Sequence, residues 1–255
     1  MENQLTDEEL LLLNNVMYME GQEPLQNVIN KMAKNTDMSL GGALDQEIID
    51  ALREMGSDIV GDTHTSGKEW ADIMEGIKAN EALSSLTIPA STAEVQYVYE
   101  DSNNGKFACF VTEDNQPIAV ARGTGAKEWM DNFESGYLAD SLQQERAMAW
   151  IESLPYEDIT VTGHSKGGNK MKYAALLSDK VSRCVSYDGE GFSVEFFEKY
   201  QAEIYQNKHK ITAYALDNDF VNIMMPDIYG EKYYLKGYGI QSFEENHCSN
   251  SAFVL

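Results

Sequence analysis

The stretch from Ile159 to Lys170, ITVTGHSKGGNK, places a serine between a short apolar run and a glycine-rich segment. The apolar run is rich in β-branched residues and predicts a strand, and the residues after the turn predict a helix. Gly163, Ser165 and Gly167 have the spacing Gly-x-Ser-x-Gly, which is typical of a nucleophile elbow. Small residues on both sides of the serine let strand and helix approach closely. The pattern therefore predicts a serine hydroxyl that stands clear at the beginning of a helix.

A phosphate-binding loop is the alternative interpretation of these glycines. A Walker loop requires a glycine, four further residues and then Gly-Lys-Ser/Thr. Counted from Gly163, Gly168 is in register, but Asn169, Lys170 and Met171 follow it. The lysine is displaced and the hydroxyl that would bind magnesium is missing, so the sequence disfavours a nucleotide-hydrolysing enzyme.

Strands and helices alternate in the second half of the chain. The expected strands are 158–163, 182–188, 210–216 and 232–237, and the expected helices begin at Gly167 and span 193–205. Such alternation is typical of βαβ units and predicts a parallel sheet. Between residues 93 and 123, three β-rich runs separated by turn sequences predict an antiparallel meander. The expected fold class is therefore α/β, with a mostly parallel central sheet flanked by helices.

Residues 1–88 carry helical patterns and no catalytic motif. Capping boxes that begin at Thr6 and Ser66 mark two helix starts, because a serine or threonine and a glutamate three residues later bond each other's backbone N–H groups. We expect the helix after Ser66 to continue to about Leu83.

The chain has 255 residues, of which 43% are hydrophobic, so it is long enough and apolar enough to bury a large core. We expect a single domain over residues 1–255. In it, residues 1–88 form a mostly helical N-terminal segment, and residues 89–255 form the sheet core with the catalytic residues.

Acidic residues dominate the charge of the chain. The net charge of −23 repels nucleic acid and anionic membrane surfaces, so neither nucleic-acid binding nor stable membrane insertion is expected. The sequence has no leader pattern and no apolar run near the ~18 residues of a membrane helix, so we expect a cytoplasmic protein. Cys109, Cys184 and Cys248 are odd in number and far apart, which fits reduced thiols. No cofactor or metal site is indicated, and the expected partner is a small-molecule substrate.

A serine hydroxyl is a weak nucleophile until a base removes its proton. In hydrolases with an elbow, the chain order is serine, then aspartate or glutamate, then histidine. Only His209 and His247 follow Ser165, and His209 precedes the best candidate acid. We therefore expect His247 to be the base, with an exposed tail residue as the alternative interpretation.

Three aspartates are candidates for the acid. Asp217 and Asp219 follow one expected strand, and Asp188 follows the strand before it. Side chains at the carboxyl ends of parallel strands enter a common crevice. We prefer Asp219, with Asp217 and Asp188 as alternatives, and expect the acid to fix the imidazole tautomer and stabilise the imidazolium.

The reaction also needs donors for the oxyanion. The backbone N–H after the nucleophile, here that of Lys166, is the usual first donor, and a loop after an earlier strand supplies the second. Thr124 in VARGTGAKEW lies after such a strand and offers both an N–H and a hydroxyl. The alternative is that this segment is a plain turn.

Three segments resemble those of the class 3 (fungal-type) lipases. Their Arg-Gly-Thr/Ser oxyanion segment is similar to Arg122-Gly123-Thr124 followed by Trp129 and Asp131. The segment VTGHSKGGNK resembles their elbow, and DNDFVNIMMP resembles their Asp-x-Val segment that ends in proline. A closer resemblance is to a bacterial lipase-like family of mostly unassigned function, which carries Gly-His-Ser-Lys-Gly-Gly-Asn and a later Asp-Gly-Pro-Gly-Phe. In this chain Glu190 replaces the proline of the second motif.

The resemblance implies an α/β-hydrolase fold and a serine hydrolase that cleaves carboxylic esters, with lipid-derived esters as one candidate class. Ser165 would attack the acyl carbonyl, His247 would act as general base and then general acid, and Asp219 would orient it. Thr124 and Lys166 would hold the oxyanion. Folds of this kind host many functions, so the alternative is a catalytically silent, hydrolase-like binding or scaffolding protein.

Basic residues gather around the expected site in an otherwise acidic chain. They are Lys166, Lys170 and Lys172, together with Arg122 and Lys127. We expect a solvated helix face, and the alternative is a receptor for an anionic head group.

Flexible apolar residues follow the expected acid. Ile223, Met224 and Met225 are expected to be core residues, and the alternative is that they line an acyl pocket.

Overall fold

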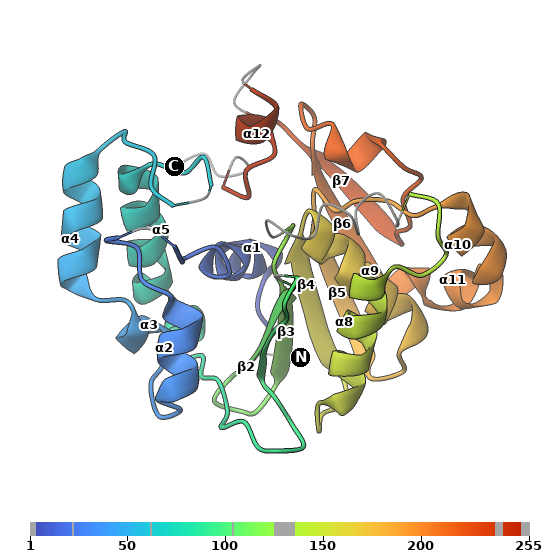
Figure 1. Cartoon of the computed structure of the whole chain (residues 1–255), viewed down its shortest axis with the longest axis horizontal. Helices are drawn as coiled ribbons and strands as arrows, with labels where there is room; N and C mark the ends of the chain where they lie inside the picture. The colour runs from blue at the N-terminus through green and yellow to red at the C-terminus, as the bar shows by residue number, and fades with distance from the viewer. Residues whose placement is uncertain are drawn as a thin grey trace.

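The computed structural model of the chain describes residues 4–21, 23–61, 63–103, 105–124, 136–237 and 242–250. Within these ranges the molecule is built around one seven-stranded sheet with helices on both faces (Figure 1). This arrangement confirms the α/β class expected from the alternation of strands and helices.

The strands lie in the sheet in the same order as in the chain. They are β1 (Val98–Glu100), β2 (Lys106–Val111), β3 (Pro117–Ala121), β4 (Ile159–His164), β5 (Val181–Tyr187), β6 (Ile211–Leu216) and β7 (Glu231–Leu235). The first three form the antiparallel meander that the turn sequences predicted. From β3 to β7 every neighbouring pair is parallel, so the sheet is mostly parallel.

Burial along the strands explains their composition. Every residue of β2, β3 and β4 is buried, which requires a cover on both faces of the sheet and accounts for the nearly continuous apolar runs of β2 and β3. The edge strand β7 has no fully buried residue and is correspondingly polar.

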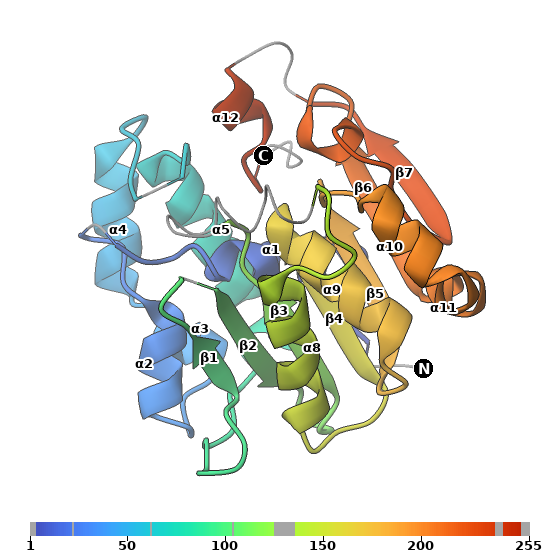
Figure 2. The same ribbon diagram turned by 45° about the vertical axis from the view of Figure 1, so that its right-hand side comes forward.

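Helices form two layers around the sheet (Figures 1 and 2). The N-terminal layer contains α1 (Asp7–Val16), α2 (Val28–Lys34), α3 (Leu40–Ala43), α4 (Gln46–Met55), α5 (Gly67–Ala79) and α6 (Glu81–Ser84). The other layer contains α8 (Leu142–Ser153), α9 (Lys166–Leu177), α10 (Val194–Lys199) and α11 (Gln201–Asn207). Helix α1 packs against β3, β4 and β5 from one side, and α9 packs against the same strands from the other.

Short helical turns complete the described structure. They are η1 (Lys208–Lys210), η2 (Val221–Ile223) and α12 (Phe243–Asn246). In both views α12 lies between α5 and β7 (Figures 1 and 2). No helix in the described ranges has the length and apolar character that crossing a bilayer requires.

Both predicted capping boxes are present, at the starts of α1 and α5. The predicted continuation of the second helix to Leu83 is wrong. Asn80 has extended dihedral angles (φ −92°, ψ 113°) and its side chain accepts a hydrogen bond from the Leu83 N–H, so α5 ends and α6 begins there. The helix predicted over 193–205 is likewise divided, because Tyr200 (φ −115°, ψ 31°) leaves the helical region between α10 and α11.

One hydrophobic cluster joins the N-terminal helices to the sheet. It includes Leu10 and Leu13 of α1, Trp70 of α5, and Val161 of β4, all buried. Removing this much apolar surface from water stabilises the two parts together. The N-terminal helices are therefore part of the same core as the strands that carry the site.

Candidate active site

Ser165 occupies the turn between β4 and α9. Its backbone angles, φ 57° and ψ −129°, lie in a region that residues other than glycine rarely adopt. A Cβ at Gly163 would lie 2.2 Å from the Gly167 carbonyl carbon, and a Cβ at Gly167 would lie 2.1 Å from the Ala121 carbonyl oxygen. Both glycines are thus required by close packing, which is the local geometry that the motif predicted.

Three residues far apart in sequence meet at this turn. The His247 Nε2 atom lies 2.7 Å from Ser165 Oγ, and His247 Nδ1 lies 2.9 Å from Asp219 Oδ2. When Nδ1 carries the proton and donates a hydrogen bond to the carboxylate, Nε2 is an acceptor for the serine hydroxyl. The chain order of elbow hydrolases selected these three residues, and the structure brings them into hydrogen-bonding contact.

Asp219 is held by the loop that follows β6. Its side chain has no exposed surface, and its Oδ1 accepts a hydrogen bond from the Val221 N–H at 3.0 Å. Burial disfavours the carboxylate, but the hydrogen bond and charge of His247 and the Val221 N–H outweigh it, so the pKa of Asp219 is lowered. An ionised Asp219 is the form that orients an imidazole.

The pKa of His247 is raised above its ordinary value of 6.5. Burial opposes the imidazolium, but the hydrogen bond to Asp219 and the charges of Asp219, Asp188 and Glu190 outweigh burial. The surroundings therefore stabilise the protonated imidazole. This is the form that a base reaches when it receives the proton of Ser165.

His247 is not an exposed tail residue. Its side chain keeps only 18% of its surface exposed, and the residues Cys248, Ser249 and Asn250 that follow it are buried. Ser249 Oγ donates to Asn15 Oδ1 at 2.6 Å, and Asn250 Nδ2 donates to Glu69 Oε1 at 3.0 Å. The N-terminal helices therefore hold the segment that carries His247.

The two alternative acids have other surroundings. Asp217 is exposed, and its Oδ1 accepts a hydrogen bond from the Gly237 N–H. Asp188 is buried and accepts from the Leu216 N–H at 2.7 Å. Its pKa is raised to about 7 by burial and by the neighbouring charge of Asp219. Asp219 is thus the aspartate for which a hydrogen bond to His247 is found.

Two residues without an assigned role lie beneath the elbow. The Tyr18 hydroxyl lies 2.9 Å from His164 Nδ1 and accepts a hydrogen bond from the Gly123 N–H at 3.0 Å. The His164 ring in turn packs 4.9 Å from that of His247, measured between centroids. Burial and the charge of His247 lower the pKa of His164 to about 3, so its imidazole is neutral.

The sequence indicated only one of the two residues of this Tyr18–His164 contact. His164 stands inside the elbow motif, next to the serine, but the order of hydrolase residues gives no role to that position. Tyr18 lies just beyond α1, 146 residues from its partner, and no spacing rule connects them.

The two segments that carry the expected oxyanion residues both adjoin the serine. Lys166 is the first residue of α9, where backbone N–H groups are not used within the helix. A Cβ at Gly123 would lie 3.2 Å from Ser165 Cβ, so the loop that continues to Thr124 runs beside the elbow. The Gly123 N–H donates to the Tyr18 hydroxyl, and Thr124, the expected donor, is the next residue of this loop. Trp129 and Asp131, which belong to the same expected segment, lie outside the described residues.

The expectation of a solvated lysine face is wrong. Lys166, Lys170 and Lys172 each have 0% of their surface exposed, because α9 packs between the sheet, α8 and α11. Lys172 forms an ion pair with Asp227, and Lys166 lies 3.6 Å from Glu190. Buried amines of this kind cannot receive an anionic head group from solvent, and Lys127 lies outside the described residues.

The expectation that Ile223, Met224 and Met225 are core residues is also wrong. Ile223 is 67% exposed and Met224 is 71% exposed, while Met225 is half-buried. Phe220, next to Asp219, is 56% exposed. This short segment turns around η2, which directs Phe220, Ile223 and Met224 outward while Val221 is buried.

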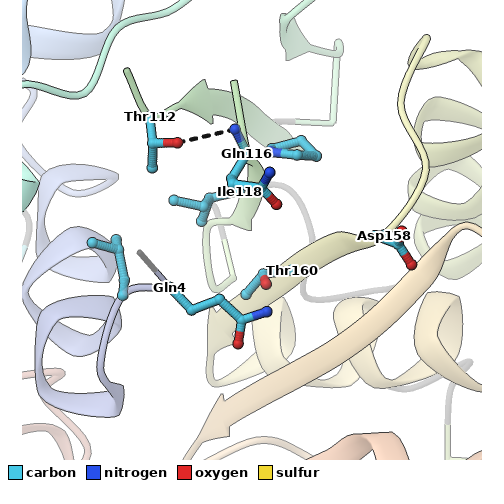
Figure 3. A pocket seen from close by; sticks show the side chains of 8 residues that line it. Gln4, Thr112, Gln116, Ile118, Asp158 and Thr160 are labelled. Atoms are coloured by element: carbon cyan, nitrogen blue, oxygen red, sulfur yellow. Dashed lines mark hydrogen bonds between the residues drawn. The ribbon is translucent and has the colours of Figure 1, made fainter. Parts of the chain in front are cut away.

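A small hollow lies at the other end of the strands, where β3 and β4 begin (Figure 3). It is lined by Gln4, Leu5, Thr112, Gln116, Pro117, Ile118, Asp158 and Thr160. Its open space holds about one water molecule, and Ser165 is not among its residues. Within the described ranges, no group of histidine, cysteine and acidic side chains has the arrangement of a metal site.

Comparison with known proteins places the chain in a family. The Mbeg1-like family model matches residues 86–229, more than half of the chain. The matched region contains Ser165 and Asp219 and ends before His247. No curated protein matches the chain. The chain therefore belongs to the Mbeg1-like family, a lipase-like family related to the class 3 lipases.

Proposed function

We propose that the protein is a serine hydrolase that cleaves carboxylic esters through an acyl-enzyme. The observation that carries this proposal is the continuous relay from Ser165 Oγ to His247 Nε2 at 2.7 Å and from His247 Nδ1 to Asp219 at 2.9 Å. A nucleophile, a base and an orienting acid in hydrogen-bonding reach of one another are the parts that acyl transfer requires. Membership of a lipase-like family supports the same reaction class.

The first half of the reaction transfers the acyl group to the enzyme. As Ser165 Oγ attacks the ester carbonyl, its proton passes to His247 Nε2, and Asp219 stabilises the imidazolium. The negative oxygen of the tetrahedral intermediate accepts hydrogen bonds from the backbone N–H groups of Lys166 and Thr124. The intermediate then expels the alcohol, which takes the proton from His247, and leaves an ester on Ser165.

The second half releases the acyl group. A water molecule gives a proton to His247 Nε2 as its oxygen attacks the acyl carbon. The new tetrahedral intermediate returns Ser165 Oγ as leaving group, which recovers the proton, and the carboxylic acid departs. The site ends in its starting protonation state.

The exposed apolar side chains next to Asp219 support an apolar acyl group. Phe220, Ile223 and Met224 face solvent within five residues of the acid of the relay. Apolar surface of this kind gains free energy when an alkyl chain covers it. We therefore include lipid-derived esters among the substrates, to be tested with esters of increasing acyl length.

A fluorophosphonate probe tests the proposed function, because it forms a covalent bond only with an activated serine. We expect labelling of the wild-type protein, measured by intact mass, and a loss of labelling rate of roughly a thousandfold or more in Ser165→Ala and His247→Ala. The exposed His209 provides the matched control, and His209→Ala should label like the wild type. A well-folded wild-type protein that is not labelled, or labelling that survives Ser165→Ala, would contradict the proposal.

The labelling rate should also depend on pH in one direction. His247 accepts a proton only as the neutral imidazole, and its pKa lies above 6.5. The rate is therefore expected to be low when the imidazole is protonated and to rise as the pH passes the folded-state pKa.

A further inference from the structure

Glu20 lies shortly after α1 and forms ion pairs with two cations of the sheet region. Its Oε1 pairs with the Arg122 guanidinium, and its Oε2 pairs with the Lys106 ammonium. The Lys106 side chain is 1% exposed and that of Arg122 is 9% exposed, so both charges are removed from water. Buried charges are tolerated when an opposite charge is held beside them. The Glu20 carboxylate supplies that opposite charge to both cations.

The two cations lie on neighbouring strands, at the end of the sheet that carries the elbow. Lys106 is the first residue of β2, and Arg122 follows the last residue of β3, which pairs with β4 beside the elbow. The Arg122 N–H donates to the Lys106 carbonyl at 3.0 Å. Arg122 begins the loop of residues 122–124, here named the oxyanion loop, which ends at the expected donor Thr124. Glu20 thus bonds the first residue of this loop.

Two further groups contact the oxyanion loop through its backbone. Lys170 Nζ donates to the Arg122 carbonyl at 3.4 Å, and the Gly123 N–H donates to the Tyr18 hydroxyl at 3.0 Å. The ion pair with Glu20 differs from these contacts because a side chain of the loop makes it. It can therefore be removed by substitution without deleting a backbone hydrogen bond of the loop.

The position of Glu20 is fixed by its own segment. Its N–H donates to the Tyr18 carbonyl at 2.8 Å, and Met19 between the two residues is buried. Asn27, the N-cap of α2, donates from Nδ2 to Glu20 Oε2 at 3.2 Å. These contacts hold the carboxylate independently of Arg122. The N-terminal segment therefore offers the oxyanion loop a fixed point of attachment.

The ion pair also decides one alternative for Arg122. This residue belongs to the basic cluster for which an anionic head group was the alternative ligand. Its guanidinium is buried and already paired with Glu20, so it cannot receive an anion from solvent. Arg122 is thus directed toward the interior of the protein rather than toward a ligand.

We propose that Glu20 is a positioning residue, whose ion pair with Arg122 fixes the oxyanion loop, and with it the Thr124 N–H, relative to Ser165. A Cβ at Gly123 would lie 3.2 Å from Ser165 Cβ, so a movement of this loop changes the surroundings of the nucleophile. Donors stabilise an oxyanion only when they lie at hydrogen-bonding distance from the place where it forms. The catalytic consequence rests on the proposed function, but the attachment of the loop does not.

Two matched substitutions separate the position of the loop from the balance of buried charge. Arg122→Met leaves Glu20 paired with Lys106, and Lys106→Met leaves Glu20 paired with Arg122, so each variant keeps one anion and one cation. A fluorophosphonate adduct also places an oxygen at the oxyanion position, so the labelling rate responds to the loop. We expect this rate to fall by about tenfold or more in Arg122→Met and to stay within about threefold of the wild type in Lys106→Met. Equal rates in the two variants would overturn the proposal.

Glu20→Gln removes the charge and keeps the shape of the side chain. We expect its labelling rate to fall as in Arg122→Met. In the double variant the rate should be no lower than in Arg122→Met, because one ion pair is lost in each case, whereas losses that multiply would contradict action through this pair. If Glu20→Gln does not fold, the comparison of Arg122→Met with Lys106→Met decides the question.

A purely structural role for Glu20 makes a different prediction. It would lower the melting temperature and leave the labelling rate of the folded protein unchanged. Asp7→Asn is the control for such a loss, because Asp7 also joins the N-terminal segment to an arginine of the sheet, Arg183, and is 27% exposed against 21% for Glu20. Rates are compared where circular dichroism shows each variant folded. The pH at which the rate rises should be that of the wild type in Glu20→Gln, because the hydrogen bonds of His247 to Ser165 and Asp219 remain.

Hydrogen exchange of the Gly123 N–H tests the attachment of the loop without any probe. Nuclear magnetic resonance follows this exchange relative to the N–H groups of β4, which corrects for changes in overall stability. We expect exchange faster by about tenfold or more in Glu20→Gln and Arg122→Met, and unchanged in Lys106→Met and Asp7→Asn. Unchanged exchange in Arg122→Met would overturn the proposal. A wild-type protein that is never labelled would defeat the proposed function, whereas this exchange would still decide whether Glu20 holds the loop.

Discussion

Tyr18 connects three parts of the site that are distant in sequence. Its hydroxyl accepts from the Gly123 N–H of the candidate oxyanion loop and lies 2.9 Å from the His164 ring of the elbow. Because the Gly123 N–H is directed to Tyr18, the orientation of the next peptide, which carries the Thr124 N–H, depends on this tyrosine. Tyr18 is in this way a positioning residue that belongs to the N-terminal segment.

Replacing Tyr18 with phenylalanine removes this hydroxyl and keeps the ring. We expect the labelling rate to fall by about tenfold, because the Thr124 loop loses its orientation, and the free energy of unfolding to fall by about 1–3 kcal/mol, because the Gly123 N–H is left without its partner. Labelling kinetics and chemical denaturation measure the two effects. Tyr205 on α11 is 86% exposed, so Tyr205→Phe is the control that should change neither quantity. Equal rates in Tyr18→Phe and the wild type would show that the loop is oriented by other contacts.

The junction of β4 and α9 is the element on which the site depends. The strands on both edges of β4 contact this junction. On one edge, β3 and the loop that follows it lie against the start of α9, and on the other edge β5 pairs with β4. Gly167 makes the closest of these approaches at the helix, with no room for a Cβ beside the Ala121 carbonyl. The distance between the oxyanion loop and the serine is therefore set by the absence of a side chain.

Gly167→Ala tests this close approach. The added methyl group would lie 2.1 Å from the Ala121 oxygen, so β3 and the loop after it must move away from the elbow. We expect a loss of about 1–3 kcal/mol in the free energy of unfolding and a labelling rate lower by about tenfold or more. Gly76 lies inside α5, where an added methyl group would meet nothing within 4 Å beyond the helix's own backbone, and Gly76→Ala should instead stabilise the protein by about 0.5–1 kcal/mol. A stable and fully reactive Gly167→Ala protein would contradict this account of the elbow.

On the scale of the whole molecule, the N-terminal helices act on the site from two directions. Tyr18 reaches the elbow from beneath, and Asn15 and Glu69 hold the segment that follows His247. These helices also share the hydrophobic cluster of the sheet. The base of the relay is thus positioned by residues at the opposite end of the chain.

Asn250→Ala tests whether this anchoring matters for the base. The substitution removes the hydrogen bond to Glu69 and the contacts of Asn250 Oδ1 with Thr65 and Cys248. We expect the labelling rate to fall by about tenfold at a temperature where the protein remains folded, because His247 loses its fixed distance to Ser165. Asn35 is exposed at the end of α2, so Asn35→Ala serves as the control for loss of an asparagine side chain. A rate unchanged in Asn250→Ala would show that His247 is held by Asp219 and Ser165 alone.

Local patterns were enough to predict most of the elements and part of the site. The apolar run before Gly163, the glycines around Ser165 and the capping boxes at Thr6 and Ser66 are short-range features, and each predicted its local structure correctly. The chain order of elbow hydrolases also selected His247 and Asp219, which the structure brings to the serine. Charge and hydropathy were poorer guides to exposure. The lysines of α9 are buried because helices cover them on the side away from the sheet, and Met224 is exposed because the loop around η2 turns it outward.

By itself, the sequence determined the order of strands and helices, the strained turn at Ser165 and the succession of serine, acid and histidine, because these depend on neighbouring residues or on order along the chain. The tertiary structure alone decided that Asp219 bonds His247 and that Tyr18 supports the elbow. Such contacts join residues far apart in the chain, so they depend on strand order, on the packing of α1 against the sheet and on the path of the segment after α12. No short-range pattern encodes those relations, because they arise only when the separate elements bury their apolar faces against one another.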